Sequence, residues 1–298
     1  MRTDTESAPR RSRRTRGYAL TAGCALTLFT GVACGGTEEE GEPDRSAVGE
    51  PVELGDVEAV ERGDLESLFE DAGVDGTFVL YDANGRSAVL VGADGAHERA
   101  VPGATFELPN TLIALQTGAV SDVDETISPD RGEGRSLRAD LSASGTSVHH
   151  EVAERIGHER MSTWVDRFDY GNRGVGDEDD LGRFWAEGPL EISALEQATF
   201  LAGLARAELP VDVEHQETLR ELVALEEGSD YRLFGPTGHG EDDEAHGWWV
   251  GWVERSDELH TFALRLDEGS EGDAELRESL GRGFLVELDV LPGEAAEA

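Results

Sequence analysis

The order of strand-like and helix-like segments constrains the fold of this chain more than any other feature. Two strand-like runs, Thr77–Tyr81 and Ser87–Val91, flank the tetrapeptide Asp82-Ala83-Asn84-Gly85, and an Asn-Gly pair favours a tight turn between antiparallel strands. Helical segments fill the middle of the chain, three more strand-like runs follow, and a helix comes last. This order predicts an α+β fold: an antiparallel sheet flanked by helices and completed by both chain ends, with an inserted helical subdomain.

Hydrophobic spacing and end signals place the individual segments. The spacing predicts helices at Asp64–Ala72, Thr105–Gln116, Val148–Phe168 (broken near Gly157), Gln216–Leu225 and from about Ala274 onward. It predicts the three later strands at Tyr231–Phe234, Trp248–Glu254 and Thr261–Leu266. A further helix begins after Ser193 and runs to about Ala207, because Ser193 and Glu196 match a capping box.

Acidic residues dominate the charged composition. Of 298 residues, 64 are Asp or Glu and 25 are basic, which gives a formal net charge of −39 at pH 7. Such a chain repels a phosphate backbone, so nucleic acid is not expected as a partner. A heavily carboxylated surface stays soluble when salt screens its self-repulsion, which favours a salt-adapted, halophilic source.

Lysine is absent from the sequence, so all 25 basic residues are arginine. Arginine stays protonated at any accessible pH and does not act as a general base. A mechanism that needs a neutral or carbamylated amine therefore has no side chain in this chain to use.

The first 34 residues have the features of an export signal. A basic segment precedes an apolar run from Tyr18 to Val32, which is typical of a secretory leader and too short for a comfortable membrane span. Gly31-Val32-Ala33-Cys34 resembles a bacterial lipobox. We therefore expect residues 1–34 to be a lipoprotein signal peptide, with Cys34 the site of lipid attachment; an ordinary cleaved signal is the alternative.

The expected organisation after the leader is an acidic flexible tether at residues 35–62 and one domain at residues 63–298. Cys24 lies inside the leader, so the mature domain has no disulfide. We expect the protein to be exported and lipid-anchored to the bacterial cell envelope, facing the periplasm or the exterior.

Five further segments occur in a fixed order, namely Pro102–Asn110, Ser144-Gly145-Thr146, Tyr170-Gly171-Asn172, Phe184–Gly188 and Pro236-Thr237-Gly238. Their order and spacing resemble those of class D (oxacillinase-type) serine β-lactamases and the related penicillin-binding, transpeptidase-like domains. The resemblance runs from about residue 63 to residue 287. Within the second segment, Ser144 fits the register of the later motifs better than Ser142 or Ser147.

The resemblance implies a catalytic site whose reactive side chains are substituted. In the family, a serine attacks the lactam carbonyl and a carbamylated lysine one helical turn later takes its proton. Here these positions hold Ala104 and Glu107, and Pro236 stands at the lysine of the third motif. Alanine offers no nucleophile and Glu107 has no serine hydroxyl to activate, so hydrolysis by the family route is not expected.

Other positions implied by the resemblance keep the features of a ligand pocket. The segment Thr237-Gly238-His239 would pair with a bound amide, and the backbone N–H groups of Ala104 and His239 would form an oxyanion hole. Arg277 resembles the arginine that holds the ligand carboxylate, with a plain surface residue as the alternative. Trp185 would cover the lysine position, or would simply be core.

Three functions remain open from the sequence. The favoured one is a β-lactamase-like pseudoenzyme that retains a pocket for β-lactams or peptidoglycan peptides. The second is an active β-lactam hydrolase with a relocated nucleophile such as Ser144, and the third is an envelope protein that binds a partner and no small ligand. No cofactor is expected, and no metal, because the histidines do not follow a recognised ligand spacing.

Overall fold

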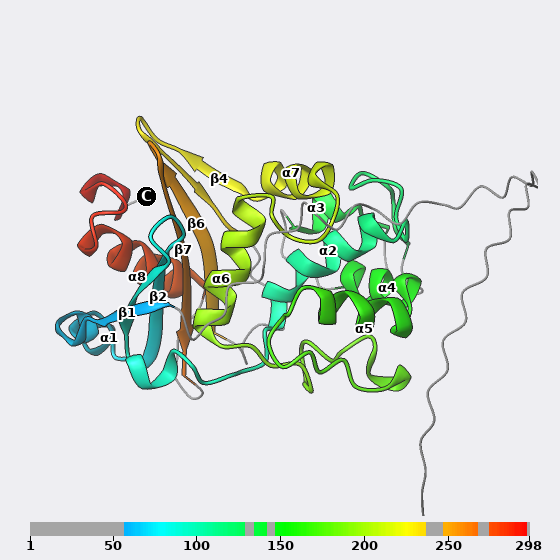
Figure 1. The fold of residues 1–298 in the computed structure, drawn as a ribbon, viewed down its shortest axis with the longest axis horizontal. Coiled ribbons are helices and arrows are strands. Elements are labelled where there is room, and N and C mark those ends of the chain that lie inside the picture. Colours follow the sequence, from blue (N-terminus) through cyan, green and yellow to red (C-terminus); the bar gives the residue numbers. More distant parts are fainter. Residues whose placement is uncertain (1–56, 129–133, 142–146, 237–246, 268–273, 297–298) are drawn as a thin grey trace, which may run out of the picture. The chain divides into compact units, whose positions relative to one another are not determined.

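In the computed structural model, which describes residues 57–128, 134–141, 147–236, 247–267 and 274–296, the strands form one seven-stranded sheet (Figure 1). The strand order is β1-β3-β2-β7-β6-β5-β4. The strands are β1 (Glu58–Glu61), β2 (Gly76–Asp82), β3 (Ser87–Val91), β4 (Ala224–Glu227), β5 (Tyr231–Phe234), β6 (Trp248–Arg255) and β7 (Glu258–Leu266). Strands from both ends of the domain meet at the β2–β7 pair, as the order of the predicted segments requires.

All neighbouring strands are antiparallel except β1, which runs parallel to β3. The predicted α+β class, with a sheet flanked by helices and completed by both chain ends, is confirmed. The parallel β1 makes the sheet mixed. Since β1 occupies Glu58–Glu61, the last residues of the segment predicted as a tether are part of the sheet.

The two faces of the sheet are covered by different helices. Along β7, Thr261 and Ala263 face one side whereas Phe262 and Leu264 face the other, as the two-residue period of a strand requires. The helix α6 (Ala194–Ala205) packs on the first face, against β7, β2 and β6. The helices α1 (Ser67–Ala72) and α8 (Ala274–Glu287) pack on the second (Figure 1).

The helical subdomain lies beyond α6, on the side away from α8 (Figure 1). It contains α2 (Glu107–Gln116), α3 (Leu137–Leu141), α4 (Ser147–Ile156), α5 (His158–Arg167) and α7 (Val213–Leu222). Its buried side chains belong to the same hydrophobic core as the α6 face of the sheet. The subdomain and the sheet therefore share one core.

Most predicted elements are present, with differences at their ends. The predicted break at Gly157 separates α4 from α5, and Ser193 and Glu196 form the predicted capping box of α6. The predicted helix Gln216–Leu225 is wrong at its end, because α7 stops at Leu222 and Ala224 already pairs with β5.

No helix among the described residues is both long enough and apolar enough to span a bilayer. The leader, including Cys34, lies outside the described residues.

Candidate active site

The segment that resembles the nucleophile motif forms the start of α2. Residues Gly103–Phe106 make one turn of 3₁₀-helix, and α2 continues directly from Glu107. Gly103 has φ +54°, a left-handed conformation that favours glycine, and its N–H donates to the Trp185 carbonyl at 2.8 Å. Ala104, at the predicted nucleophile position, is half-buried in this first turn.

The sheet meets the helical subdomain beside this turn. Trp248 begins β6, and its Nε1–H donates to the Val101 carbonyl at 2.9 Å, three residues before Ala104. The candidate site therefore lies at the junction of the two parts of the fold, where strand β6 approaches the beginning of α2.

Trp185 packs into the core behind this turn. It is 3% exposed and stacks on Phe106 with ring centroids 5.4 Å apart. Phe184 meets both rings edge-on, at 5.0 Å from each. Aromatic pairs in these geometries are stabilising, so Trp185 holds the start of α2 in place, consistent with the expectation that it serves as core.

Thr105 does not point toward the position of Ala104. Its hydroxyl donates to the Pro102 carbonyl at 2.8 Å and accepts from the Gln197 amide. The Gln197 carbonyl in turn accepts from the Tyr170 hydroxyl at 3.2 Å, and burial raises the pKa of Tyr170. This buried chain of hydrogen bonds ties the 3₁₀ turn at Gly103–Phe106 (η5) to α6 and engages the Thr105 hydroxyl away from the Ala104 position.

Tyr170-Gly171-Asn172 is a structural turn. Gly171 has φ +53°, and a Cβ at this position would lie 2.1 Å from the Glu191 carbonyl oxygen, so only glycine fits. The Asn172 side chain accepts from the N–H groups of Gly174 (2.9 Å) and Glu191 (3.1 Å). It also donates to the Pro189 carbonyl at 2.9 Å.

Glu107, at the predicted base position, lies near other titratable side chains. It is 2% exposed, and its Oε2 lies 3.7 Å from Nε2 of His149 on α4. The same Nε2 lies 3.8 Å from Oδ2 of Asp140 on α3. Three helices thus bring two carboxyl groups and an imidazole together next to the start of α2.

Burial governs the charges in this cluster. It raises the pKa of the Asp140 carboxyl to about 6, against a smaller opposing effect of Arg135. Burial also lowers the pKa of the His149 imidazole to about 3, and His150 adds to this effect. The imidazole is therefore neutral throughout the physiological range.

The remaining predicted site residues fall into two groups. Arg277, on α8, is 5% exposed, so the alternative that it is a surface residue is wrong. Pro236 is half-buried just after β5. The others lie outside the described residues: Cys34, Ser144, Thr237, Gly238 and His239. For all of them the assigned roles stay predictions.

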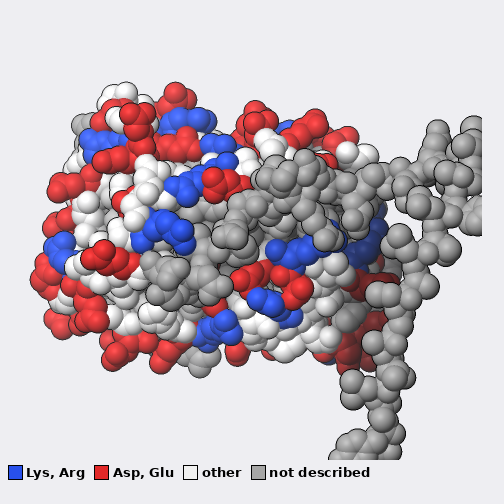
Figure 2. All heavy atoms as spheres, viewed as in Figure 1, with Lys and Arg blue, Asp and Glu red and all other residues white. Residues whose placement is uncertain are grey.

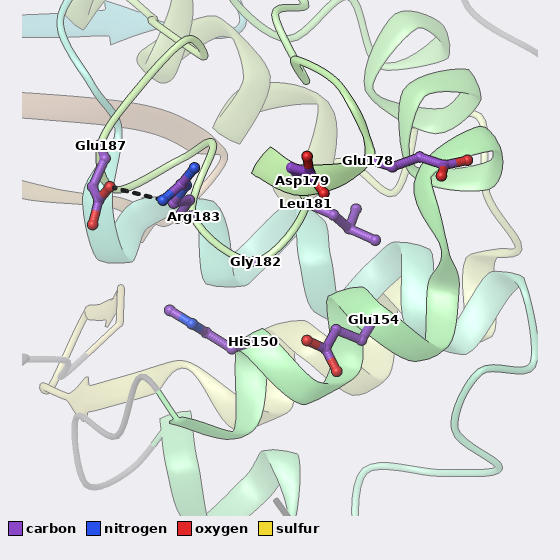
Figure 3. A pocket seen from close by; sticks show the side chains of 8 residues that line it. All are labelled: His150, Glu154, Glu178, Asp179, Leu181, Gly182, Arg183 and Glu187. Atoms are coloured by element: carbon purple, nitrogen blue, oxygen red, sulfur yellow. Dashed lines mark ion pairs between the residues drawn. The ribbon is translucent and has the colours of Figure 1, made fainter. Parts of the chain in front are cut away.

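A separate acidic pocket of about 390 Å³ lies between α4 and the loop that precedes Trp185 (Figure 3). None of the predicted site residues that the structure describes line it. The lining residues are His150, Glu154, Glu178, Asp179, Leu181, Gly182, Arg183 and Glu187. The His150 ring contacts the Trp185 ring edge-on at 5.2 Å, so the pocket adjoins the candidate site. Its four carboxylates oppose an anionic ligand.

In the part of the chain that the structure describes, no group of three or more His, Cys, Asp or Glu residues is arranged to hold a metal ion. The cluster around His149 was not predicted from the sequence. Asp140 lies among the buried residues of α3, with Leu137 and Leu141. His149 lies among the buried residues of α4, with Val148 and Val152. A polar side chain on an apolar helix face was the available signal.

Known proteins share both the sequence pattern and the fold. The penicillin binding protein transpeptidase domain family matches residues 76–284. Beta-lactamase OXA-5 of Pseudomonas aeruginosa is 31% identical over 238 residues, 76% of this chain and 88% of the relative. Beta-lactamase OXA-20 of the same organism is 34% identical over 235 residues, 75% of this chain and 86% of the relative.

Solved structures agree with these relatives. FUS-1 (OXA-85), a class D β-lactamase from Fusobacterium nucleatum subsp. polymorphum, matches with a TM-score of 0.70 and 34% identity, covering 78% of this chain and 100% of that one. The class D β-lactamase YbXI from Nostoc matches with a TM-score of 0.70 and 29% identity, covering 77% and 100%. This chain therefore belongs to the penicillin-binding transpeptidase-domain family, as a class D serine β-lactamase-like member.

Proposed function

We propose that the protein is a β-lactamase-like pseudoenzyme: an exported lipoprotein, anchored to the cell envelope through Cys34, that does not hydrolyse β-lactams. The observation that carries this proposal is the pair of side chains at the motif positions. Ala104 has no attacking oxygen. Glu107 is buried with its carboxylate beside His149, and Ala104 offers it no hydroxyl to deprotonate.

The scaffold around these positions supports a retained ligand pocket. Ala104 lies in the first turn of η5, where helix geometry supplies no intrahelical acceptor for its N–H. A bound carbonyl oxygen can take that hydrogen bond whatever the side chain is. Arg277 is a further charged group of the proposed pocket, suited to a carboxylate of a β-lactam or a peptidoglycan stem peptide.

Two other functions are distinguished by experiment. A hydrolase with Ser144 as nucleophile requires acylation of that residue. An envelope protein without a small ligand requires neither acylation nor ligand binding. On the face shown in Figure 2, arginines are interspersed with carboxylates and uncharged residues. The net charge of −39 disfavours an anionic macromolecule as partner.

The decisive experiment compares the wild-type protein with S144A and with A104S/E107K, assayed with nitrocefin in high salt. We expect no turnover above buffer for the wild type or S144A. We expect a covalent penicillin adduct, seen by intact-protein mass spectrometry, only for A104S/E107K, because that variant restores the hydroxyl and amine. Turnover by homogeneous wild-type protein would refute the proposal, and its loss in S144A would identify the relocated nucleophile.

Ligand retention is tested by thermal unfolding with penicillins and muropeptide stems. At a ligand concentration a hundred times Kd, binding stabilises by about 2.7 kcal/mol, which raises Tm by roughly 5–10 °C for a domain of this size. The same measurement with R277A serves as the control, since the arginine is proposed to hold the ligand carboxylate. No shift with any ligand would favour the envelope-interaction reading.

A further inference from the structure

A buried group of titratable side chains joins three helices of the subdomain. Glu107 comes from α2, Asp140 from α3 and His149 from α4. Asp140 is fully buried and His149 is 1% exposed. Among the described residues, neither Asp140 oxygen nor His149 Nε2 has a hydrogen-bond partner. Buried polar atoms without a hydrogen-bond partner are rare, because each one raises the free energy of the folded state.

Asn110 determines which nitrogen of His149 carries the proton. Its Nδ2 donates to the backbone carbonyl of His149 at 3.0 Å, which fixes the orientation of the amide. The same Nδ2 lies 3.3 Å from Nδ1 of the imidazole. Since Nδ2 is a donor, Nδ1 must accept, and the hydrogen of the neutral ring is on Nε2.

This tautomer decides what the cluster can bind. Nε2–H is directed toward Glu107 and Asp140, at 3.7 and 3.8 Å, so it is not a free lone pair for a metal ion. A second proton on the ring would have to go to Nδ1, which already faces the donor Nδ2 of Asn110. The imidazole therefore resists protonation on geometric grounds as well as through burial.

The Asp140 carboxyl has little positive charge close to it among the described residues. Arg135 is a cationic neighbour of Asp140: its Nη1 lies 3.8 Å from Oδ1, and its side chain is 48% exposed. The next residue on α4, His150, is exposed. Two buried carboxylates beside a neutral imidazole are expensive to ionise together, and a proton is the smallest species that relieves this cost.

We propose that Glu107, Asp140 and His149 form a proton-binding site, in which mild acid adds one proton to the Asp140 carboxylate and none to the imidazole. The step is the uptake of one solvent proton by the carboxylate to give the neutral acid. It converts an acceptor-only group into one with an O–H that can donate inside the cluster. This inference goes beyond the proposed function and does not depend on whether a β-lactam binds.

The contributions of Asp140 and His149 to the pH dependence of stability nearly cancel in mild acid. As pH falls, the unfolded chain gains a proton on His149 while the folded protein gains one on Asp140, so the numbers of bound protons stay nearly equal. The depressed imidazole pKa removes stability as pH falls below about 6.5. The raised carboxyl pKa adds stability over the same range, because the folded state then binds the proton more tightly.

Replacing Asp140 or His149 leaves the pH dependence of stability that comes from the other residue. With the folded-state values of about 3 for His149 and about 6 for Asp140 and ordinary unfolded values, we expect D140N to lose stability from pH 7 to 4.5. Its unfolding constant should rise roughly 50- to 100-fold. From the Asp140 contribution alone, the unfolding constant of H149F should fall roughly 20-fold, whereas the two groups together should change the wild-type constant only a few-fold.

The test is urea unfolding at pH 7 and 4.5 at constant salt, with D124N as the matched control. Asp124 is exposed and paired with Arg138 in the same region, so D124N should follow the wild type. Parallel pH profiles for D140N and the wild type would overturn the proposal.

A direct measurement keeps the proposal falsifiable if H149F does not fold. In NMR titrations of the wild type, one carboxyl resonance absent from D140N should titrate above pH 5. The His149 ring should remain neutral, with the hydrogen on Nε2, down to pH 4. An imidazole that titrates near its ordinary pKa, or a carboxyl that titrates near 4, would contradict the assignment.

Discussion

Two glycines on one helix should respond in opposite directions to the same substitution. Gly281 and Gly283 both lie within α8. A Cβ at Gly281 would lie 2.1 Å from Cε3 of Trp249, whereas a Cβ at Gly283 would meet nothing within 4 Å. The indole has no room to retreat, because it is buried against Phe262 with ring centroids 4.4 Å apart.

The magnitudes follow from this geometry. Carbon atoms pack at about 3.5–4.0 Å, so G281A must separate α8 from the sheet by more than an ångström, an overpacking that costs about 1–3 kcal/mol. Replacing glycine by alanine in a helix returns about 0.5–1 kcal/mol. A cost at the upper end leaves G281A less stable by about 2 kcal/mol, while G283A becomes more stable by about 0.5–1 kcal/mol.

The assay is equilibrium urea unfolding of both variants beside the wild type, with Tm as a second readout. For a domain of this size we expect Tm to fall by roughly 4–8 °C in G281A and to rise by roughly 1–4 °C in G283A. If both variants move in the same direction, close approach of α8 to Trp249 is not what requires glycine at position 281.

Three further predictions concern the supports of the candidate site. F106A, which empties a fully buried position between Tyr170, Phe184 and Trp185, should lower the free energy of unfolding by about 3–5 kcal/mol, measured by urea unfolding. N172A, which orphans two backbone N–H donors, should cost about 1–3 kcal/mol; a loss below about 0.5 kcal/mol would show that the turn holds itself. S193A removes the side-chain half of the α6 capping box and should cost about 1 kcal/mol, with S193T as the conservative control in thermal unfolding.

The sequence predicts the long, strongly patterned elements well. The hairpin around Asn84, the break at Gly157 and the cap at Ser193 each have a local chemical cause, so they are visible without the structure. The strands β1 and β4 are different. Each is four residues long at an edge of the sheet and rich in glutamate, and only pairing with β3 or β5 makes it a strand.

Part of the candidate site is likewise predictable from the sequence, and part of it depends on tertiary packing. The positions of Ala104 and Glu107 at the start of a helix follow from the motif and its helical spacing. The contacts of His149 with Glu107 and Asp140 do not, because α4 meets α2 and α3 only through tertiary packing. The short helix α3 carries no periodic signal of its own over five residues.

The first strand of the domain also affects how copies of the protein meet. In the described residues, β1 is the outermost strand on its side of the sheet, and it presents two glutamates together with an exposed Val60. Like-charged side chains on such a border discourage a second molecule from extending the sheet. Strong salt screens that repulsion, so the β1 edge opposes association less under the conditions that best suit the acidic surface. The four-residue length of β1 then limits how far a second sheet could pair with it.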